Sequence, residues 1–404
     1  MMPYALFRQF FVVLVCTVTL CACAPLPRLD AGMQDGRDDV TVAGLPNARF
    51  YFDGDLQPFV HEVRRLIERQ TATAMIQGRT VSPLPPAHVL AISGGGDNGA
   101  FGAGLLAGWS ATGKRPEFMM VTGVSAGALI APFAFLGPDY DQVIADVATT
   151  LSASDVFRSR SMITGLLSSD GMADSAPLQK IVAHYVTPEV LAAVAREYEK
   201  GRYLQISTTD LDSGRAVQWN MGAIAASGAI DLFRRVMVAS TSIPGVVSPV
   251  MFDVEAGGHH YQEMHVDGGV ITQVVTYPTH ALDELRKLGV STDREVHVYV
   301  IRNGRVDPEP IRTERSTLSI GARALSQLVQ RQGISDLERI YHRAQVDGYD
   351  YNVAYIGRDF NCPHRYEFDT QYMQHLFDYA YQRSLHGSPW HKVPPTELEK
   401  LPTG

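Results

Sequence analysis

The arrangement best suited to chemistry in this sequence is a serine placed between two glycines. Gly123-Val124-Ser125-Ala126-Gly127 follows an apolar run that is typical of a buried strand, and it precedes a stretch typical of a helix. A nucleophilic hydroxyl needs such a tight strand-to-helix turn, and Gly123 and Gly127 would let the backbone make it. The N-terminus of the following helix would also favour negative charge near the serine. The pattern predicts a nucleophile, although glycine and serine are common in ordinary loops as well.

A glycine-rich loop precedes the serine in the chain and also follows an apolar run. It consists of Gly94, Gly95, Gly96, Asp97, Asn98 and Gly99. Unobstructed backbone N–H groups in such a loop can stabilise an oxyanion. A nucleotide phosphate loop is the competing interpretation, but a Walker loop requires Gly-Lys-Ser/Thr, and the match to a dinucleotide fingerprint is loose. We therefore predict an oxyanion hole, with a simple flexible turn as the alternative.

A third motif, Asp267-Gly268-Gly269, supplies a carboxylate next to glycines. An aspartate at a sharp turn near a sheet edge can reach a neighbouring loop and act as a base. On its own, Asp-Gly-Gly is an ordinary turn signal. Its meaning therefore depends on the two motifs that precede it.

Taken together and in this order, the three motifs resemble those of the patatin-like phospholipase family. That family reads G-G-G-x-R/K-G, G-x-S-x-G and D-G-A/G, and the resemblance extends over roughly Ala87 to Arg302. It implies a three-layer α/β/α sandwich with a mostly parallel central sheet. It also implies hydrolysis of fatty-acyl esters of lipids by a Ser125/Asp267 dyad through an acyl-enzyme, without a cofactor or metal. Asn98 departs from the pattern, because many members carry Arg or Lys there.

Two other functions remain open at this point. An α/β-hydrolase esterase would add a histidine to the serine and aspartate, and seven histidines follow Asp267: His280, His297, His342, His364, His375, His386 and His391. Most of them are expected to be structural or on the surface. A non-catalytic lipoprotein that binds lipid or a partner is the second alternative, and Asn98 favours it because it removes a positive charge from the loop.

The elements that must position these motifs alternate along the chain. Apolar runs at 88–92, 118–121, 203–208 and 295–301 predict strands, and residues 101–109 and 126–136 predict helices between them. Such alternation is typical of a parallel sheet covered on both faces. Phe59, Val63, Leu66 and Ile67 predict a leading helix. Late in the chain, Ser335 and Glu338 predict the capping box of a new helix.

The N-terminal residues predict export and a lipid anchor. Residues 1–22 combine Arg8 with a short apolar stretch, and Leu20-Cys21-Ala22-Cys23 resembles a bacterial lipoprotein signal. Cys23 would then carry the lipid, and residues 23–48 would form a flexible tether. The resemblance predicts the outer membrane of a Gram-negative bacterium, since the residue after Cys23 is not aspartate. The remaining cysteine, Cys362, has no partner for a disulfide and is expected to be a quiet thiol.

Composition limits the remaining possibilities. The 404 residues are 45% hydrophobic and 19% charged, which allows a substantial core. The net charge of −8 argues against a nucleic-acid partner, and the expected partners are a lipid substrate and the anchored membrane. We predict a leading helical segment at 49–86, the catalytic domain at 87–302 and a helical extension at 303–404 packed on that domain.

Overall fold

The computed structural model describes residues 28–31, 40–79, 81, 83–156, 158–159, 170–171, 173–278, 280–290, 292–307 and 312–398. The predicted signal segment and the lipidation residue Cys23 lie outside these residues. Among the helices that are described, none is long and apolar enough to cross a membrane.

Five parallel strands form the core of the central sheet, because each long apolar run is followed by a helix that returns the chain to the same edge. In spatial order they are β7 (Tyr203–Asp210), β4 (Met120–Val124), β3 (Ala87–Ile92), β11 (Val296–Arg305) and β12 (Asp350–Ile356). The predicted α/β class with a central, mostly parallel sheet is confirmed. Four of these strands overlap the predicted apolar runs.

Antiparallel strands extend the sheet beyond β7, and the alternation of strands and helices did not predict them. They are β8 (Arg215–Asn220), β9 (Val250–Ala256), β10 (His259–Asp267) and the short β1 (Thr41–Val42) and β2 (Arg49–Tyr51). A separate pair joins β5 (Arg158–Ser159) and β6 (Ala173–Asp174). Strands β9 and β10 form a hairpin around Gly257 and Gly258, a glycine pair that favours such turns.

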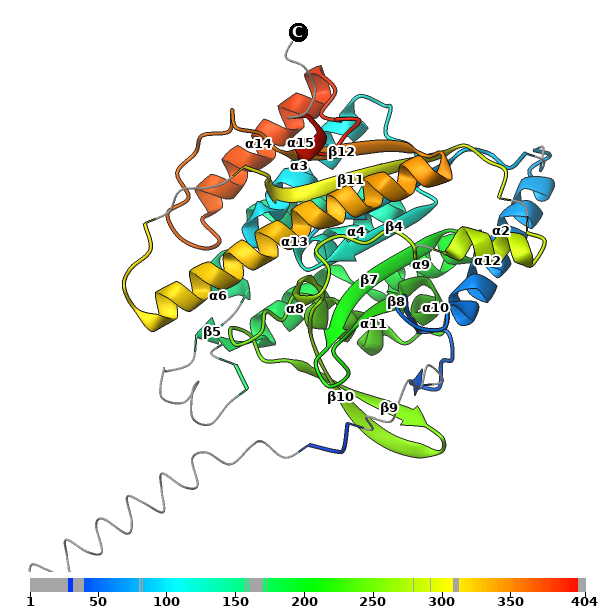
Figure 1. Cartoon of the computed structure of the whole chain (residues 1–404), viewed down its shortest axis with the longest axis horizontal. Helices are drawn as coiled ribbons and strands as arrows, with labels where there is room; N and C mark the ends of the chain where they lie inside the picture. The colour runs from blue at the N-terminus through cyan, green and yellow to red at the C-terminus, as the bar shows by residue number, and fades with distance from the viewer. Residues whose placement is uncertain are drawn as a thin grey trace, which may run out of the picture.

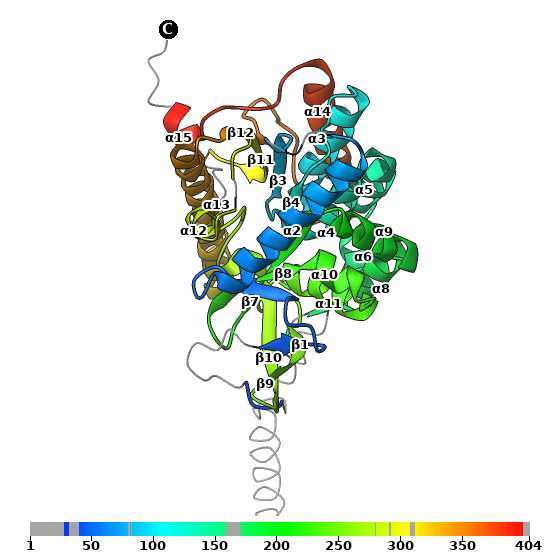
Figure 2. The ribbon, with the colours of Figure 1, turned by 90° about the vertical axis from the view of Figure 1, so that its right-hand side faces the viewer.

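Helices cover both faces of the sheet (Figures 1 and 2). One face carries α12 (Ala281–Lys287) and α13 (Thr317–Asp347). The other carries α3 (Gly99–Ala111), α4 (Ala126–Leu136), α5 (Asp141–Thr149), α8 (Ala176–Tyr185), α9 (Pro188–Glu199), α11 (Ile230–Ser240) and α14 (Thr370–His386). Shorter helices are α6 (Ala153–Val156), α10 (Met221–Ala226) and α15 (Pro395–Leu398), and α2 (Gln57–Ile76) contacts both α12 and α9.

The strand sequence explains why both faces are covered. Leu90 and Ile92 of β3 point into the core on the α3 and α4 side, whereas Val89 and Ala91 belong to the core under α13. Because successive side chains alternate between the two faces, a continuous apolar run requires a helix layer on each.

The C-terminal part differs from the sequence-based prediction in two ways. Residues 303–404 are not only helical, since they add β12 to the sheet. Helix α13 is also continuous through Ser335 and Glu338, so the predicted capping box is wrong. Buried Ile334, Leu337 and Ile340 continue one helical stripe across Ser335, and this packing leaves no reason for a break. The helix begins instead after Ser316, whose Oγ accepts a 3.2 Å hydrogen bond from Ser319 N–H.

Parts of the predicted tether pack on the domain. The guanidinium of Arg28 donates to Asp212 at 2.9 Å and also to the carbonyl of Gln262. Thr41–Val42 pairs with β9 at the edge of the sheet. The chain before the leading helix is therefore held against the antiparallel hairpin at both of these points.

Two strands end against each other along one edge of β7. Strand β4 runs parallel to β7 and ends with Val124 opposite Ser207, while β10 runs antiparallel and ends with Asp267 opposite Thr208. Both lie on the side of β7 that β8 does not occupy, because Gln205 to Asp210 pair with β8 on the other side. The residues that leave the two strands are thereby brought face to face.

Candidate active site

Ser125 occupies a strained turn between β4 and α4. Its φ of 53° lies in the left-handed region, which is rare for a residue with a side chain. Two hydrogen bonds hold the turn in place. Ser125 N–H donates to Ser240 Oγ at 3.0 Å, and that hydroxyl donates to the Ser207 carbonyl at 2.7 Å. Gly127 is required by space, since a Cβ there would lie 2.3 Å from the Ile92 carbonyl oxygen.

Asp267 faces Ser125 at the end of β10. Its Oδ2 accepts a 2.6 Å hydrogen bond from Ser125 Oγ, and its Oδ1 accepts one of 2.7 Å from Gly269 N–H. The following Gly268 is also required by space, because a Cβ would lie 2.4 Å from the Ser207 carbonyl oxygen. Burial raises the pKa of Asp267 to about 6, against the opposing effect of its hydrogen bonds from Ser125 and Gly269.

The glycine loop lies beside this pair, and three of its N–H groups are already committed. Gly94 N–H donates to the Gln273 carbonyl at 3.2 Å, Asn98 N–H to the Gly95 carbonyl at 3.1 Å, and Gly99 N–H back into the loop. Among the described residues, the N–H groups of Gly95, Gly96 and Asp97 donate to no protein group. These three donors remain for a bound oxyanion.

The side chains of the loop are held by residues late in the chain. Asp97 Oδ2 accepts hydrogen bonds from His364 Nε2 at 2.7 Å and from Phe368 N–H at 2.9 Å. Asn98 Oδ1 accepts a 2.6 Å hydrogen bond from the Tyr372 hydroxyl. Sequence reasoning named His364 only as one of seven histidines for a possible triad, and it missed Phe368 and Tyr372. No motif marks them, and only the packing of α14 against α3 brings them to the loop.

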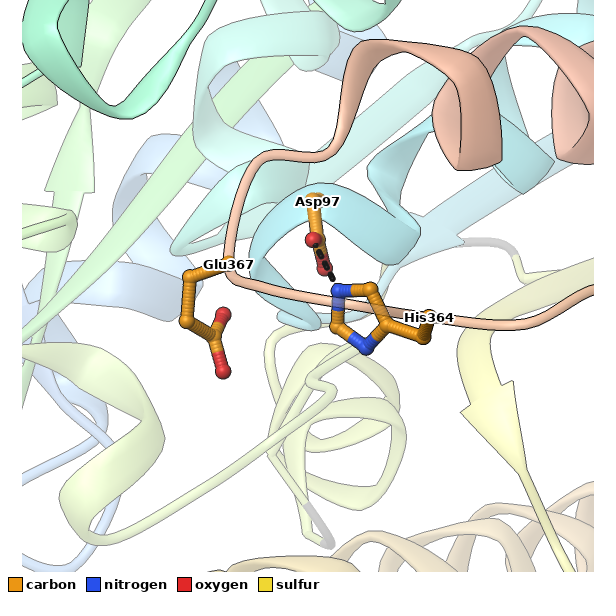
Figure 3. Close-up of side chains that lie close together, drawn as sticks. All are labelled: Asp97, His364 and Glu367. Carbon is orange, nitrogen blue, oxygen red and sulfur yellow. Dashed lines mark hydrogen bonds and ion pairs between the residues drawn. The ribbon is translucent and has the colours of Figure 1, made fainter.

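Asp97, His364 and Glu367 form one cluster that resembles a metal site (Figure 3). One possible ligand atom from each lies within 4.8 Å of the others. The loop that carries His364 and Glu367 crosses over Asp97, and His364 points its Nε2 at the carboxylate. Because Nε2 donates its proton to Asp97, this nitrogen would have to lose the hydrogen bond before it could ligate a cation. The hydrogen-bonded arrangement is the one that the geometry supports.

A second cluster consists of Asp210, Glu263 and His265, and its possible ligand atoms form hydrogen bonds with other protein groups. Arg49 donates to both oxygens of Glu263, and His265 hydrogen-bonds to Glu263 and to Thr208. Burial raises the pKa of Glu263, but the hydrogen bonds from Arg49 and His265 outweigh it and lower the pKa to about 2. This cluster ties β10 to β2 and to β7.

The structure brings none of the described histidines into hydrogen-bonding contact with the serine and aspartate. The recorded partners of Ser125 and Asp267 are each other and nearby serine, glycine and alanine groups. His265, which shares β10 with Asp267, is bound by Thr208 and Glu263. Cys362 lies 3.2 Å from His375 Nδ1, a pair that the sequence did not indicate and that has no contact with the dyad.

An apolar cavity of about 760 Å³, counted with its open mouth, leads to Ser125. Its floor and walls come mainly from α4, α5, α8 and the loop after α11. The lining side chains include Leu129, Ile130, Val147, Leu151, Leu178, Ile243, Val246 and Met373. A long aliphatic chain fits such a surface, because its transfer from water gains about 0.8 kcal/mol for each buried CH₂ group.

Residues 90–282 match the family model described as patatin-like phospholipase. Among solved structures, VipD from Legionella pneumophila has 13% identity and a TM-score of 0.34, with coverage of 73% of this chain and 66% of that one. The type III effector ExoU has 14% identity and a TM-score of 0.28, with coverage of 77% and 56%. This chain thus spans under two thirds of the length of each. No curated protein matches it.

Proposed function

We propose that this chain, which belongs to the patatin-like phospholipase family through residues 90–282, hydrolyses acyl esters of lipids with Ser125 as nucleophile and Asp267 as base. The observation that carries the proposal is the 2.6 Å hydrogen bond between Ser125 Oγ and Asp267 Oδ2 at the mouth of an apolar cavity. The family supports lipid acyl hydrolysis in general, and the dyad is the specific mechanism that we infer.

In the first step, Asp267 accepts the proton of Ser125 as Oγ attacks the ester carbonyl carbon. The C–O bond to the alcohol then breaks, the proton passes to the leaving alcohol, and an acyl-enzyme remains on Ser125. In the second step, water attacks the carbonyl carbon of the acyl-enzyme while Asp267 accepts its proton. The bond to Ser125 Oγ then breaks, the proton returns to Ser125, and the fatty acid is released. Burial supports the role of Asp267, because a pKa near 6 makes it a stronger base than an exposed aspartate while leaving it ionised at pH 7.

The oxyanion of each tetrahedral intermediate is stabilised by backbone donors. Gly95, Gly96 and Asp97 supply the N–H groups that remain uncommitted in the glycine loop, and Ala126 adds the N-terminus of α4. Loss of one donor in such a hole typically costs about 2.7–4 kcal/mol of transition-state stabilisation. Asn98 does not alter these donors, since its side chain accepts from Tyr372 instead.

The decisive experiment is active-site labelling of the full chain with a fluorophosphonate, followed by peptide mapping and assays with lipid esters. Labelling is expected at Ser125 and is expected to be lost in Ser125→Ala and in Asp267→Asn. Ser227→Ala, a serine at the end of α10 and away from the dyad, is the matched control and should label normally.

Two outcomes would contradict the proposal. Folded protein that neither labels nor cleaves esters would support the non-catalytic alternative, with Asn98 as the first residue to change. Loss of activity on replacing one histidine would support a Ser-Asp-His esterase, and full activity in Asp267→Asn would exclude Asp267 as the base.

We also propose that the chain is an exported lipoprotein anchored through Cys23. The support is the sequence alone, in which Leu20-Cys21-Ala22-Cys23 follows a short apolar stretch. Metabolic labelling with palmitate tests it: the wild type should incorporate label into the membrane fraction, and Cys23→Ser should not. Equal incorporation in both would overturn the assignment.

A further inference from the structure

The first half of α13 has no core to pack on. None of its described side chains from residue 317 to 332 is buried, whereas Ile334, Leu337, Ile340 and Ala344 of the second half are. Large apolar side chains are nevertheless exposed there: Ile320 is 56% accessible, Leu325 50% and Leu328 68%. Soluble proteins rarely leave such a concentration in water unless it contacts another surface.

This half-helix lies at the edge of the sheet where Ser125 and Asp267 meet. Helix α13 follows β11, whose carboxyl end is at the same edge as that of the parallel β4. Gln332 donates to the carbonyl of Ile271, four residues after Asp267, and Gln330 donates to that of Asp307. In Figure 1 the N-terminal end of α13 extends beyond the sheet, and Figure 2 shows α13 on the face opposite to that of α6.

Three more exposed apolar side chains lie beside the dyad itself. Val270 follows Asp267 by three residues and is 43% accessible, and Ile243 and Val246 border the mouth of the cavity. We call Ile243, Val246, Val270, Ile320, Leu325 and Leu328 the apolar rim. Leu328 precedes Gln332 by one helical turn, so α13 and the loop after Asp267 join the two parts of the rim.

The charge of the half-helix is opposite to that of the whole chain. From Thr317 to Gln332 the sequence contains Arg323 and Arg331 and no acidic residue, although the net charge of the chain is −8. A helix with exposed leucines and arginines is typical of segments that lie in the interface of a bilayer. Each basic residue near an anionic lipid surface adds to the attraction.

We propose that the apolar rim docks on the surface of a bilayer containing anionic lipid and presents the cavity mouth to that surface. The inference rests on the proposed function, since a lipid substrate is what makes a bilayer the natural partner of this edge. A lipid molecule would then pass from the bilayer along Ile243 and Val246 to Ser125 without crossing water. A protein partner would equally cover leucines, but it would not explain why one part of the rim, Ile243 and Val246, borders the mouth of the apolar cavity.

The test measures which part of α13 enters the bilayer. Tryptophan is introduced in the full chain by Leu328→Trp or, as the matched control, by Val346→Trp, each in a Ser125→Ala background that leaves the lipids intact. Val346 is 77% accessible on the same helix, and 18 residues at about 1.5 Å each place it about 27 Å farther along. The vesicles contain brominated phosphatidylcholine with or without phosphatidylglycerol, and emission is read as the difference from the parent protein.

The proposal predicts quenching and a blue shift for Leu328→Trp, stronger with phosphatidylglycerol, and neither change for Val346→Trp. Equal responses at both positions, or none at Leu328→Trp, would overturn it. A second variant, Leu325→Asp with Leu328→Asp, should lower turnover of vesicle lipid about tenfold, equivalent to about 1.4 kcal/mol, relative to turnover of a short soluble ester.

These readouts separate the two proposals. Quenching at Leu328→Trp in a protein that cleaves no ester would retain the docking surface and reject the hydrolase. A hydrolase whose double variant loses no vesicle activity would retain the dyad and reject the docking surface. A double variant that only converts a dimer to a monomer would assign the rim to a second copy of the chain and overturn the bilayer.

Discussion

His364 donates a hydrogen bond of 2.7 Å to Asp97 across 267 positions of sequence, and it does so from outside the region that the family model matches. Phe368 N–H binds the same carboxylate oxygen, and Phe368 also lines the cavity. Asp97 in turn belongs to the glycine loop, in which the N–H groups of Gly95, Gly96 and Asp97 itself are free of partners among the described residues. The C-terminal segment therefore fixes the glycine loop and completes the wall of the apolar cavity.

We predict that His364→Ala lowers kcat and leaves KM nearly unchanged. A hydrogen bond to a charged group contributes about 1.5–3 kcal/mol, so partial loss of loop order should reduce kcat about tenfold. Steady-state kinetics with a soluble ester would measure both constants. His364→Gln keeps an N–H donor and should restore most of the rate. A fall in thermal stability with no change in kcat would show that His364 only supports the fold.

The raised pKa of Asp267 predicts the pH dependence of activity. Asp267 must be ionised to accept the serine proton, so kcat/KM should rise with pH through about 6 and reach a plateau above it. The pH profile of a soluble ester measures this directly. A profile that is flat from pH 5 to pH 8 would contradict Asp267 as the base.

The same shift predicts that Asp267→Asn stabilises the fold at neutral pH. The native state binds more protons than the unfolded state between about pH 4 and pH 6, so stability of the wild type falls as pH rises through that window. Two pKa units correspond to about 2–3 kcal/mol, which the variant should gain at pH 8 and lack below pH 4. Denaturant unfolding at both pH values measures it, and Asp253→Asn, an exposed aspartate on β9, should show no such gain.

The sequence predicted the candidate site residues better than it predicted how the fold brings them together. The serine turn and the aspartate turn could be predicted, because each follows an apolar run and has glycines where the backbone needs space. The contact between the two turns could not be predicted, because it depends on β4 and β10 ending against each other along β7. No helix separates β9 from β10, so the alternation of strands and helices does not indicate this hairpin. The contacts of His364, Phe368 and Tyr372 with the glycine loop also depend on long-range packing, so the sequence did not predict them.

One helix boundary that was predicted from a local motif is wrong, because long-range packing decides where the helix begins. Ser335 and Glu338 have the spacing of a capping box, but the apolar stripe of α13 continues past them and overrides the local signal. The glycine loop shows the reverse case. All six of its residues were predicted as one oxyanion site, whereas hydrogen bonds within the described part of the protein leave only the N–H groups of Gly95, Gly96 and Asp97 available.

We predict that Ser240→Ala lowers the reactivity of Ser125, although Ser240 itself does not contact the substrate. Ser240 Oγ accepts from Ser125 N–H and donates to the Ser207 carbonyl, so its removal leaves a buried N–H unpaired beside a strained residue. Such a group costs about 1–3 kcal/mol, which should appear as lower stability and slower fluorophosphonate labelling of Ser125. Ser242 is a neighbouring buried serine whose hydroxyl donates to the Val238 carbonyl, and Ser242→Ala keeps the backbone carbonyl that accepts from Asp267 N–H, so this variant should label at the normal rate. Slow labelling in both would indicate general loosening of the loop.

Acyl-chain length should depend on Leu151, which lines the cavity without being fully buried. Leu151→Trp adds volume to a surface that makes no hydrogen bond with the dyad, so short esters should react at the normal rate. Long-chain esters would lose buried CH₂ groups at about 0.8 kcal/mol each, or roughly fourfold in kcat/KM for each carbon excluded. A series of esters of increasing chain length measures the position of this decline. Leu151→Met, which keeps the apolar character and similar volume, should leave the series unchanged, whereas a uniform loss at every length in Leu151→Trp would place the acyl chain elsewhere.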